Sequence, residues 1–476
     1  MPEIEKWCKE KLDMSTPDSR WHSQMALVLT GMGRRPEARE RCKDALKLEN
    51  NNWRASLLLA NIAESREDGI KILKKLVKHY GGDSGWLKEH GEDFSNFAYS
   101  LGSLYWENNI REKAVKWFSV SLEHGPVRPD LVFQIWIKYQ SDKKWDEIMS
   151  IIEKLHSESH LKVVMIAAPE SRWRNDVYAA IRQAVVNTGK FTGFDQVYEP
   201  AIDSAKEAKK YRVSFDLQQS YATALSVCPV SKTDQIRKLL EAAAGDVPYT
   251  NTDLAAAFFL IGHRLGTIYL QNAKQAKEDR KEDEAKAWLD RMSSIVPEQV
   301  KEDQMRLPLR LYAARYHLID ENKDKARRLA HNTLRMAIEL LSDNDPTNDI
   351  FAYEKILYAV IPFGDIVNAT TALALMKIET PGGFFEMPCS CQCGDTFKDP
   401  GEMWWCMDCI NVVLTTKCMH TIKDKNVCDR NHQRFQIPSW DGEKMKVLEK
   451  QVPWNGEVIS MTDWRGKLTK EYYLTK

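Results

Sequence analysis

Residues 101–126 read LGSLYWENNIREKAVKWFSVSLEHGP, and this stretch decides the fold. Gly102 and Ala114 are small, so two helices carrying them can cross at close range. Tyr105 and Phe118 are large enough to fill the space beside that crossing. Pro126 lacks a backbone N–H and stops the second helix. The stretch therefore predicts two packed antiparallel helices joined by a short turn.

The same residues occupy the offsets of a tetratricopeptide repeat, a helix pair of about 34 residues. They match its L-G-x2-Y pattern, its A-x3-F pattern and its closing proline, through Leu101, Gly102, Tyr105, Ala114, Phe118 and Pro126. Six matches in one register are far more specific than an isolated Leu-Gly-x2-Tyr.

Weaker copies flank this unit on both sides. Helix pairs are expected at 19–50, 53–79, 130–155, 174–209, 211–244, 307–341 and 349–378. Leu265, Gly266 and Tyr269 repeat the first-helix signature, and a charged insertion at 274–286 is expected to extend both helices of that pair. Stacked pairs bury one continuous core and leave a concave groove. The predicted fold class is all-α, a TPR-like right-handed α-solenoid with a small C-terminal zinc-finger module.

Composition narrows the function classes. The 476 residues contain 68 Lys and Arg and 68 Asp and Glu, so the formal net charge is zero and no nucleic-acid partner is expected. No apolar run approaches the roughly 20 residues that span a bilayer, and the first residues are too polar for a signal peptide. A cytosolic or nuclear location follows as an expectation. Neither a phosphate-binding loop nor a G-x-S-x-G elbow occurs in the sequence, which disfavours an enzyme.

Cysteines gather near the C-terminal end. Seven of the ten lie between Cys389 and Cys428, after the helical periodicity stops at 381–383. Thiols clustered in this way in a chain without a secretory signal indicate a metal site. Cys406-x2-Cys409 and Cys428-x3-His432 each place two ligands on one turn, and zinc takes four such ligands tetrahedrally. We expect a closed Cys3His zinc site at these four residues.

The remaining thiols suggest a second zinc site, so that one ion is expected and two are conceivable. Cys391, Cys393 and Cys418 supply three candidate ligands. Cys389 either replaces one of the first two or serves as the fourth ligand, for which His420 is the other candidate. The two sites would interleave along the chain and cross-link a segment that has little core of its own.

Residues 404–440 resemble the ZZ-type zinc finger, most closely the variant at the C-terminus of fungal tetratricopeptide proteins of the NACHT/STAND type. The resemblance implies that Cys406, Cys409, Cys428 and His432 hold one ion, and it assigns Cys391, Cys393 and Cys418 to the other. The opening Cys-x2-Cys of that family is Cys391-x-Cys393 here, Thr415 stands where a ligand is common, and the family's nucleotide-binding domain has no counterpart in these residues. Some ZZ fingers bind free protein N-termini through acidic residues, for which Asp395, Asp399 and Asp408 are candidates.

We therefore expect a non-enzymatic scaffold, or the sensing arm of a larger receptor, that holds a protein or peptide in its groove. The expected domains are a repeat array at 1–380, a ZZ-like finger at 385–440 and an extension at 441–476 that packs on the finger or the last helices. The alternative is a ubiquitin-ligase-like enzyme that recruits a conjugating enzyme through its zinc module. If finger and array are separate units, loss of Cys406 or His432 unfolds the finger alone. The sequence assigns no oligomeric state.

Overall fold

The chain folds into two compact units in the computed structural model, Met1–Gly193 and Phe194–Lys476. The structure describes residues 2–14, 18–246, 255–295, 306–343, 345, 347–379, 389–390, 397, 400–421, 428, 431–438 and 451–472.

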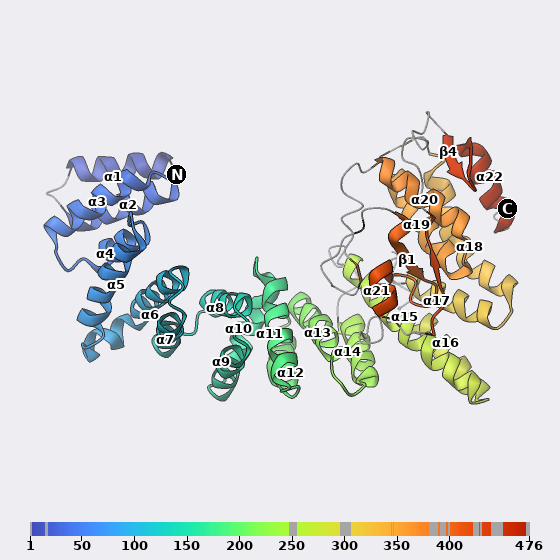
Figure 1. The fold of residues 1–476 in the computed structure, drawn as a ribbon, viewed down its shortest axis with the longest axis horizontal. Helices are drawn as coiled ribbons and strands as arrows, with labels where there is room; N and C mark the ends of the chain where they lie inside the picture. Colours follow the sequence, from blue (N-terminus) through green and yellow to red (C-terminus); the bar gives the residue numbers. More distant parts are fainter. Residues whose placement is uncertain are drawn as a thin grey trace. The chain divides into compact units, whose positions relative to one another are not determined.

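The described residues of the first unit form helices and the turns that connect them (Figure 1). Its elements are α1 (Pro2–Met14), α2 (Ser19–Gly31), α3 (Arg35–Leu48), α4 (Trp53–Asn61), α5 (Arg66–Tyr80), α6 (Ser84–Glu107), α7 (Arg111–Glu123), α8 (Pro129–Ser141), α9 (Trp145–Ser157), α10 (Leu161–Ala167), the 3-10 turn η1 (Ala168–Glu170) and α11 (Arg174–Thr188). Helices α2 and α3, α4 and α5, and α6 and α7 pack as hairpins, and each hairpin contacts the next through α3–α4 and α5–α6. This is the stacking predicted for a repeat array.

The helix crossing predicted from the L-G-x2-Y pattern is present in α6 and α7. A Cβ atom added to Gly102 would lie only 2.7 Å from Cδ1 of Phe118 and 3.2 Å from the carbonyl oxygen of Ala114. Tyr105 and Phe118 are both buried beside the contact. Glycine therefore suits position 102, because a side chain there would press against the Phe118 ring and the backbone of α7.

One turn geometry recurs between consecutive helices of the described chain. The helix ends, the second residue beyond it has a positive φ, and the following residue donates its backbone N–H to the carbonyl five residues earlier. At Asn109, with φ 59°, Ile110 N donates to Tyr105 O at 2.9 Å. The turns at Gly33, Lys143, Ser159, Lys209, Arg280 and Glu321 repeat this pattern. It is the Schellman helix end, which satisfies carbonyls left without helical partners, and it marks helix pairs whose sequences match the repeat poorly.

The second unit continues the helical hairpins and adds short strands. Its helices are α12 (Gly193–Glu207), α13 (Tyr211–Leu225), α14 (Thr233–Asp246), α15 (Ala255–Glu278), α16 (Glu282–Ser294), α17 (Arg306–Ile319), α18 (Lys323–Leu340), α19 (Asp349–Val360), η3 (Ile361–Phe363), α20 (Ile366–Glu379), η5 (Pro400–Glu402), α21 (Thr416–Thr421) and α22 (Met461–Glu471). The strands are β1 (Met403–Cys406), β2 (Val413–Thr415), β3 (Arg434–Gln436), β4 (Gln451–Trp454) and β5 (Glu457–Ser460). Strands β2, β1 and β3 form one antiparallel sheet in that order, and β4 pairs with β5.

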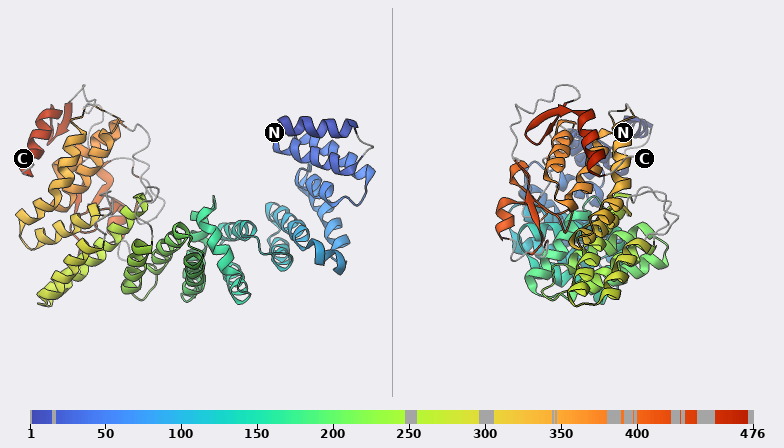
Figure 2. Two further views of the ribbon diagram at one scale, coloured as in Figure 1. Left: turned by 180° about the vertical axis from the view of Figure 1, so that it is seen from behind. Right: turned by 90° about the vertical axis from the view of Figure 1, so that its right-hand side faces the viewer.

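The described part of the C-terminal extension lies against the last helices, as both views of Figure 2 show. Trp464 of α22 is buried, and its indole N–H donates to Asn368 Oδ1 of α20 at 2.8 Å. Tyr472 donates to Asp365 at 2.9 Å, and Arg465 donates to the carbonyl of Leu341 at 2.6 Å. These bonds tie 461–472 to α18 and to the start of α20.

The all-α, TPR-like solenoid class is confirmed, and most helix pairs lie where the sequence places them. Four helices, α1, α10, α21 and α22, were not predicted. The charged insertion at 274–286 forms the end of α15 and the start of α16, with a turn at 279–281 between them. None of the helices in the described part of the chain combines the length and the hydropathy needed to traverse a bilayer. The domain boundaries at 380, 385 and 440 stay a prediction, since the contacts place the cysteine-rich segment within the second unit.

Candidate metal centre

The end of β1 and the turn after it place the first two cysteines together. Cys406 closes β1, and its sulfur accepts the backbone N–H of Cys409 at 3.2 Å. Ile410 has a positive φ of 59° and donates its N–H to the carbonyl of Cys406 at 3.0 Å. We call residues 406–410 the metal loop. Its tight turn aims both thiols to one side.

Residues that precede β3 supply the other pair, and β3 fixes their position. It lies antiparallel to β1 with Cys406 opposite Arg434, and Met407 N donates to the carbonyl of Gln433 at 2.9 Å. This register places His432 beside the metal loop. Cys428 reaches the same point from the preceding segment, so the four residues predicted for the first site converge although up to 26 residues separate them.

The ligand atoms have the spacing of a tetrahedral site. Nδ1 of His432 lies 3.6 Å from the sulfur of Cys406, 3.2 Å from that of Cys409 and 3.5 Å from that of Cys428. Cys428 Sγ lies 3.5 Å from Cys406 Sγ and 3.8 Å from Cys409 Sγ. Zn–S bonds of about 2.3 Å and Zn–N bonds of about 2.0 Å at tetrahedral angles require separations of about 3.8 Å and about 3.5 Å. All four side chains are buried, so the cluster can hold a metal ion and leaves no ligand position open to solvent.

Burial and mutual hydrogen bonds shift the pKa values of the three clustered thiols. Burial raises the pKa of Cys406 to about 12, and hydrogen bonding to Cys406 and Cys428 raises the pKa of Cys409. Hydrogen bonds from the other two thiols, helped by His432 and Arg434, hold the pKa of Cys428 far below its usual range. A bound cation would displace thiol protons, because a metal binds thiolates and releases protons. Arg434 Nη2 donates to Cys428 Sγ at 3.2 Å and offsets part of the negative charge.

Only some of the candidate ligands of the predicted second site lie within the described residues. Cys389 and Cys418 are both buried next to β2: Thr415 N lies 3.5 Å from the sulfur of Cys389, and Cys418 N donates to Thr415 Oγ1 at 3.2 Å. His420 is exposed. Cys391 and Cys393 lie outside the described residues. Two of the candidate ligands thus flank Thr415.

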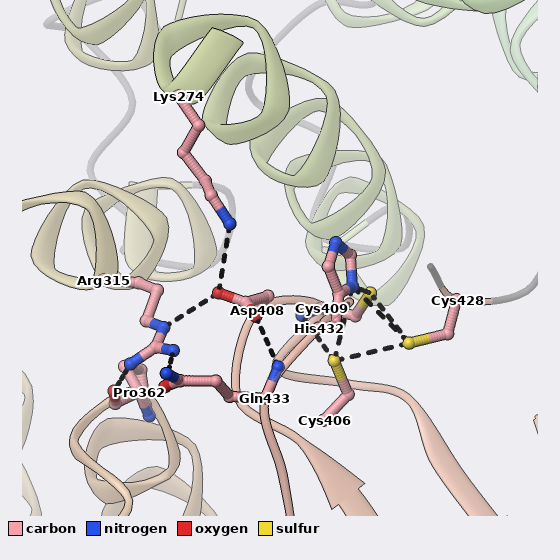
Figure 3. Close-up of polar contacts among 9 residues, drawn as sticks. All are labelled: Lys274, Arg315, Pro362, Cys406, Asp408, Cys409, Cys428, His432 and Gln433. Atoms are coloured by element: carbon pink, nitrogen blue, oxygen red, sulfur yellow. Dashed lines mark hydrogen bonds and ion pairs between the residues drawn. The ribbon is translucent and has the colours of Figure 1, made fainter. Parts of the chain in front are cut away.

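Between the two cysteines of the metal loop, Asp408 turns toward the helices and not toward solvent (Figure 3). Its Oδ1 lies 3.0 Å from Arg315 Nε of α17 and 4.0 Å from Lys274 Nζ of α15, and its Oδ2 accepts the backbone N–H of Gln433 at 2.9 Å. Only 2% of Asp408 and 5% of Arg315 is exposed. The carboxylate that the ZZ resemblance offers for binding a free N-terminus is therefore engaged within the chain. The other two candidates, Asp395 and Asp399, lie outside the described residues.

A second contact joins the metal loop to the helices through a buried tyrosine. Tyr312 of α17 donates its hydroxyl to the carbonyl oxygen of Cys409, and burial raises its pKa well above the usual value, so that it stays a donor. Thr267 Oγ1 lies 3.0 Å and His263 Nδ1 3.3 Å from the same hydroxyl. Gly266 leaves the room for this ring, because an added Cβ would lie 2.0 Å from Tyr312 Cδ2.

Arg315 and Tyr312 were not identified from the sequence as residues that contact the metal loop. Arg315 and Tyr312 sit in a helix whose neighbours are Leu and Ala, and a charged residue on such an apolar face was the available signal. Gly266 was noticed as a repeat residue, yet it packs against α17 of the next hairpin. His263 is fully buried, and in the described structure its Nε2 has no partner.

Comparison with known proteins adds little. No protein-family model and no curated protein matches this sequence. A solved structure titled "Structure of Naa15/Naa10 bound to HypK-THB" is similar over 79% of this chain and 72% of that chain, with 12% identity and a TM-score of 0.19. A TM-score this low carries no inference about shared architecture or function.

Proposed function

We propose that this chain is a non-enzymatic scaffold that binds a protein or peptide partner on its repeat array and carries one structural zinc ion in its C-terminal module. The observation that supports the metal most strongly is the buried set of three sulfurs and one nitrogen at tetrahedral spacing. Thiolate and imidazole ligands in this ratio favour zinc. Four protein ligands leave no position for a substrate, which supports a structural role and not a catalytic one. Zinc held by reduced thiolates is in keeping with the cytosol or the nucleus.

A metal measurement tests this part directly. Native mass spectrometry of the full chain should show one bound zinc, or two if the second site is filled, and Cys406→Ser should lower the count by one. Cys228→Ser is the matched control, because Cys228 is also buried but lies in the helical part. Equal zinc content in both variants would contradict the assignment.

The partner surface that we propose lies on the first unit. Tyr99 of α6 donates to Gln134 of α8 at 2.7 Å, and Arg128 donates to Asn96 at 2.7 Å. Lys138, on the same row of α8, is partly exposed, and burial lowers the pKa of its ammonium group. We call Asn96, Tyr99, Gln134 and Lys138 the α6–α8 polar face. Repeat arrays commonly use the row formed by the first helix of each pair to hold an extended peptide or a helix.

Cross-linking capture with the full chain tests the surface. We expect the double variant Gln134→Ala, Lys138→Ala to lose the partners that the unmodified chain retains. The double variant Lys116→Ala, Ser119→Ala on the exposed side of α7 should keep them. Partners lost from the α7 variant alone would place the surface elsewhere. An autoubiquitination assay tests the alternative of a ubiquitin-ligase-like enzyme. Formation of polyubiquitin that requires Cys406 would establish a ligase and overturn the scaffold proposal.

A further inference from the structure

The metal loop is the feature with consequences beyond metal binding, because it is held by helices that lie far from it in sequence. Besides the bonds of Asp408 and of the Cys409 carbonyl, Met407 lies against the turn after η3, where a Cβ added to Gly364 would be 2.8 Å from its Cε. Ile410 is fully buried. The loop thus contacts α17 through Tyr312 and Arg315, and it contacts the end of the α19–η3 segment.

Arg315 shows that these contacts are required and not incidental. All three nitrogens of its guanidinium donate hydrogen bonds. Nε donates to Asp408 at 3.0 Å, Nη1 to the carbonyl of Pro362 at 3.1 Å, and Nη2 to Gln433 Oε1 at 2.6 Å. A buried guanidinium that loses its carboxylate is strongly destabilising. The helices therefore keep Arg315 inside only while the loop presents Asp408.

The same loop conformation is the one that the metal would fix. Asp408 stands between two ligand residues, and the carbonyl that accepts from Tyr312 belongs to Cys409 itself. Without a cation, the three buried thiols and the imidazole lack the metal–ligand bonds that would hold them in one arrangement. The ion and the ion pair with Arg315 therefore stabilise a single geometry from opposite sides of the loop.

We propose that the metal loop is a metal-dependent latch: the loaded loop locks α15, α17 and η3 together, and metal loss releases Asp408 and the Cys409 carbonyl and opens this part of the helical unit. The proposal rests on the metal binding proposed above. It revises the expectation that loss of the finger leaves the array unchanged, and it excludes Asp408 as a receptor for free N-termini while metal is bound.

Hydrogen exchange of the full chain, read by mass spectrometry, tests the latch. Stripping zinc from the unmodified protein with a chelator should raise exchange in 306–319 and 349–363 at least tenfold, while 95–123 in the first unit stays unchanged. Adding zinc alone should restore protection. If native mass spectrometry finds no zinc in the unmodified protein, the proposed function fails. If zinc is bound but its removal leaves 306–319 protected, the latch alone is refuted.

A variant separates metal binding from latching. Asp408→Asn keeps all four ligands, so it should retain zinc and yet show the tenfold faster exchange in 306–319 before any chelator is added. Asp320→Asn is the matched control, because it removes a carboxylate next to the end of α17 that pairs with Lys277 at the surface. Unchanged protection in a zinc-loaded Asp408→Asn protein would refute the latch. If that variant fails to fold, the chelation experiment on the unmodified chain still decides.

Discussion

The two glycines of the L-G-x2-Y signatures should respond differently to the same substitution. An added Cβ meets Phe118 at 2.7 Å in Gly102→Ala, and it meets Tyr312 at 2.0 Å in Gly266→Ala. Alanine gains about 1 kcal/mol of helix propensity at either site, whereas overpacking costs about 1–3 kcal/mol. The Phe118 ring has no polar atom and so no hydrogen bond that fixes its position, and the net cost at Gly102 should be at most about 1 kcal/mol. Tyr312 is anchored to Cys409, so Gly266→Ala should cost at least about 2 kcal/mol.

Zinc affinity is the measurement that distinguishes Gly266→Ala from Gly102→Ala. Displacement of the Tyr312 ring removes its hydrogen bond from the metal loop, and we expect Gly266→Ala to weaken zinc binding at least tenfold in competition with a chromophoric chelator. Gly102→Ala should bind zinc like the unmodified chain. Local stability is followed by hydrogen exchange in each unit, because a chain with two units need not unfold in two states. Equal zinc affinity in two folded variants would refute the coupling from α15 through α17 to the metal loop.

Three further outcomes are expected. Arg434→Gln removes the N–H donor to Cys428 and should lower zinc affinity by about 10–100-fold, as loss of an outer-shell partner does, while Arg434→Lys should retain most of it in the same chelator assay. Burial lowers the pKa of His263 from 6.5 to about 3. Between these pH values the unfolded chain binds a proton on His263 that the folded chain does not bind. The free energy of unfolding therefore falls as pH drops below 6.5, by up to about 1.4 kcal/mol per pH unit. Urea midpoints of the second unit at pH 6.5 and 5.5 should therefore converge in His263→Gln, and an unchanged difference would contradict this account. Ser460→Ala removes the cap that accepts Asp463 N at 3.0 Å and should cost about 1 kcal/mol, visible as faster exchange confined to α22.

The sequence alone determined the helix pairs and the first ligand set. The small residues of the α6–α7 crossing act on neighbours about a dozen residues away, so their spacing along the chain reports the contact directly. The same holds for Cys406 with Cys409 and for Cys428 with His432, because each pair occupies one turn. Local geometry of this kind leaves a periodic or fixed-interval trace that can be recognised without a structure.

Only the tertiary structure decided what surrounds that ligand set. Arg315 and Asp408 are 93 residues apart, and Tyr312 and Cys409 are 97 apart, so no local spacing connects them. Gly266 resembled an ordinary repeat glycine, yet it makes room for a ring from the next hairpin. These contacts depend on how successive hairpins stack and where the returning chain meets them. Pairing of buried charges over such distances is set by three-dimensional packing, and it leaves no periodicity in the sequence.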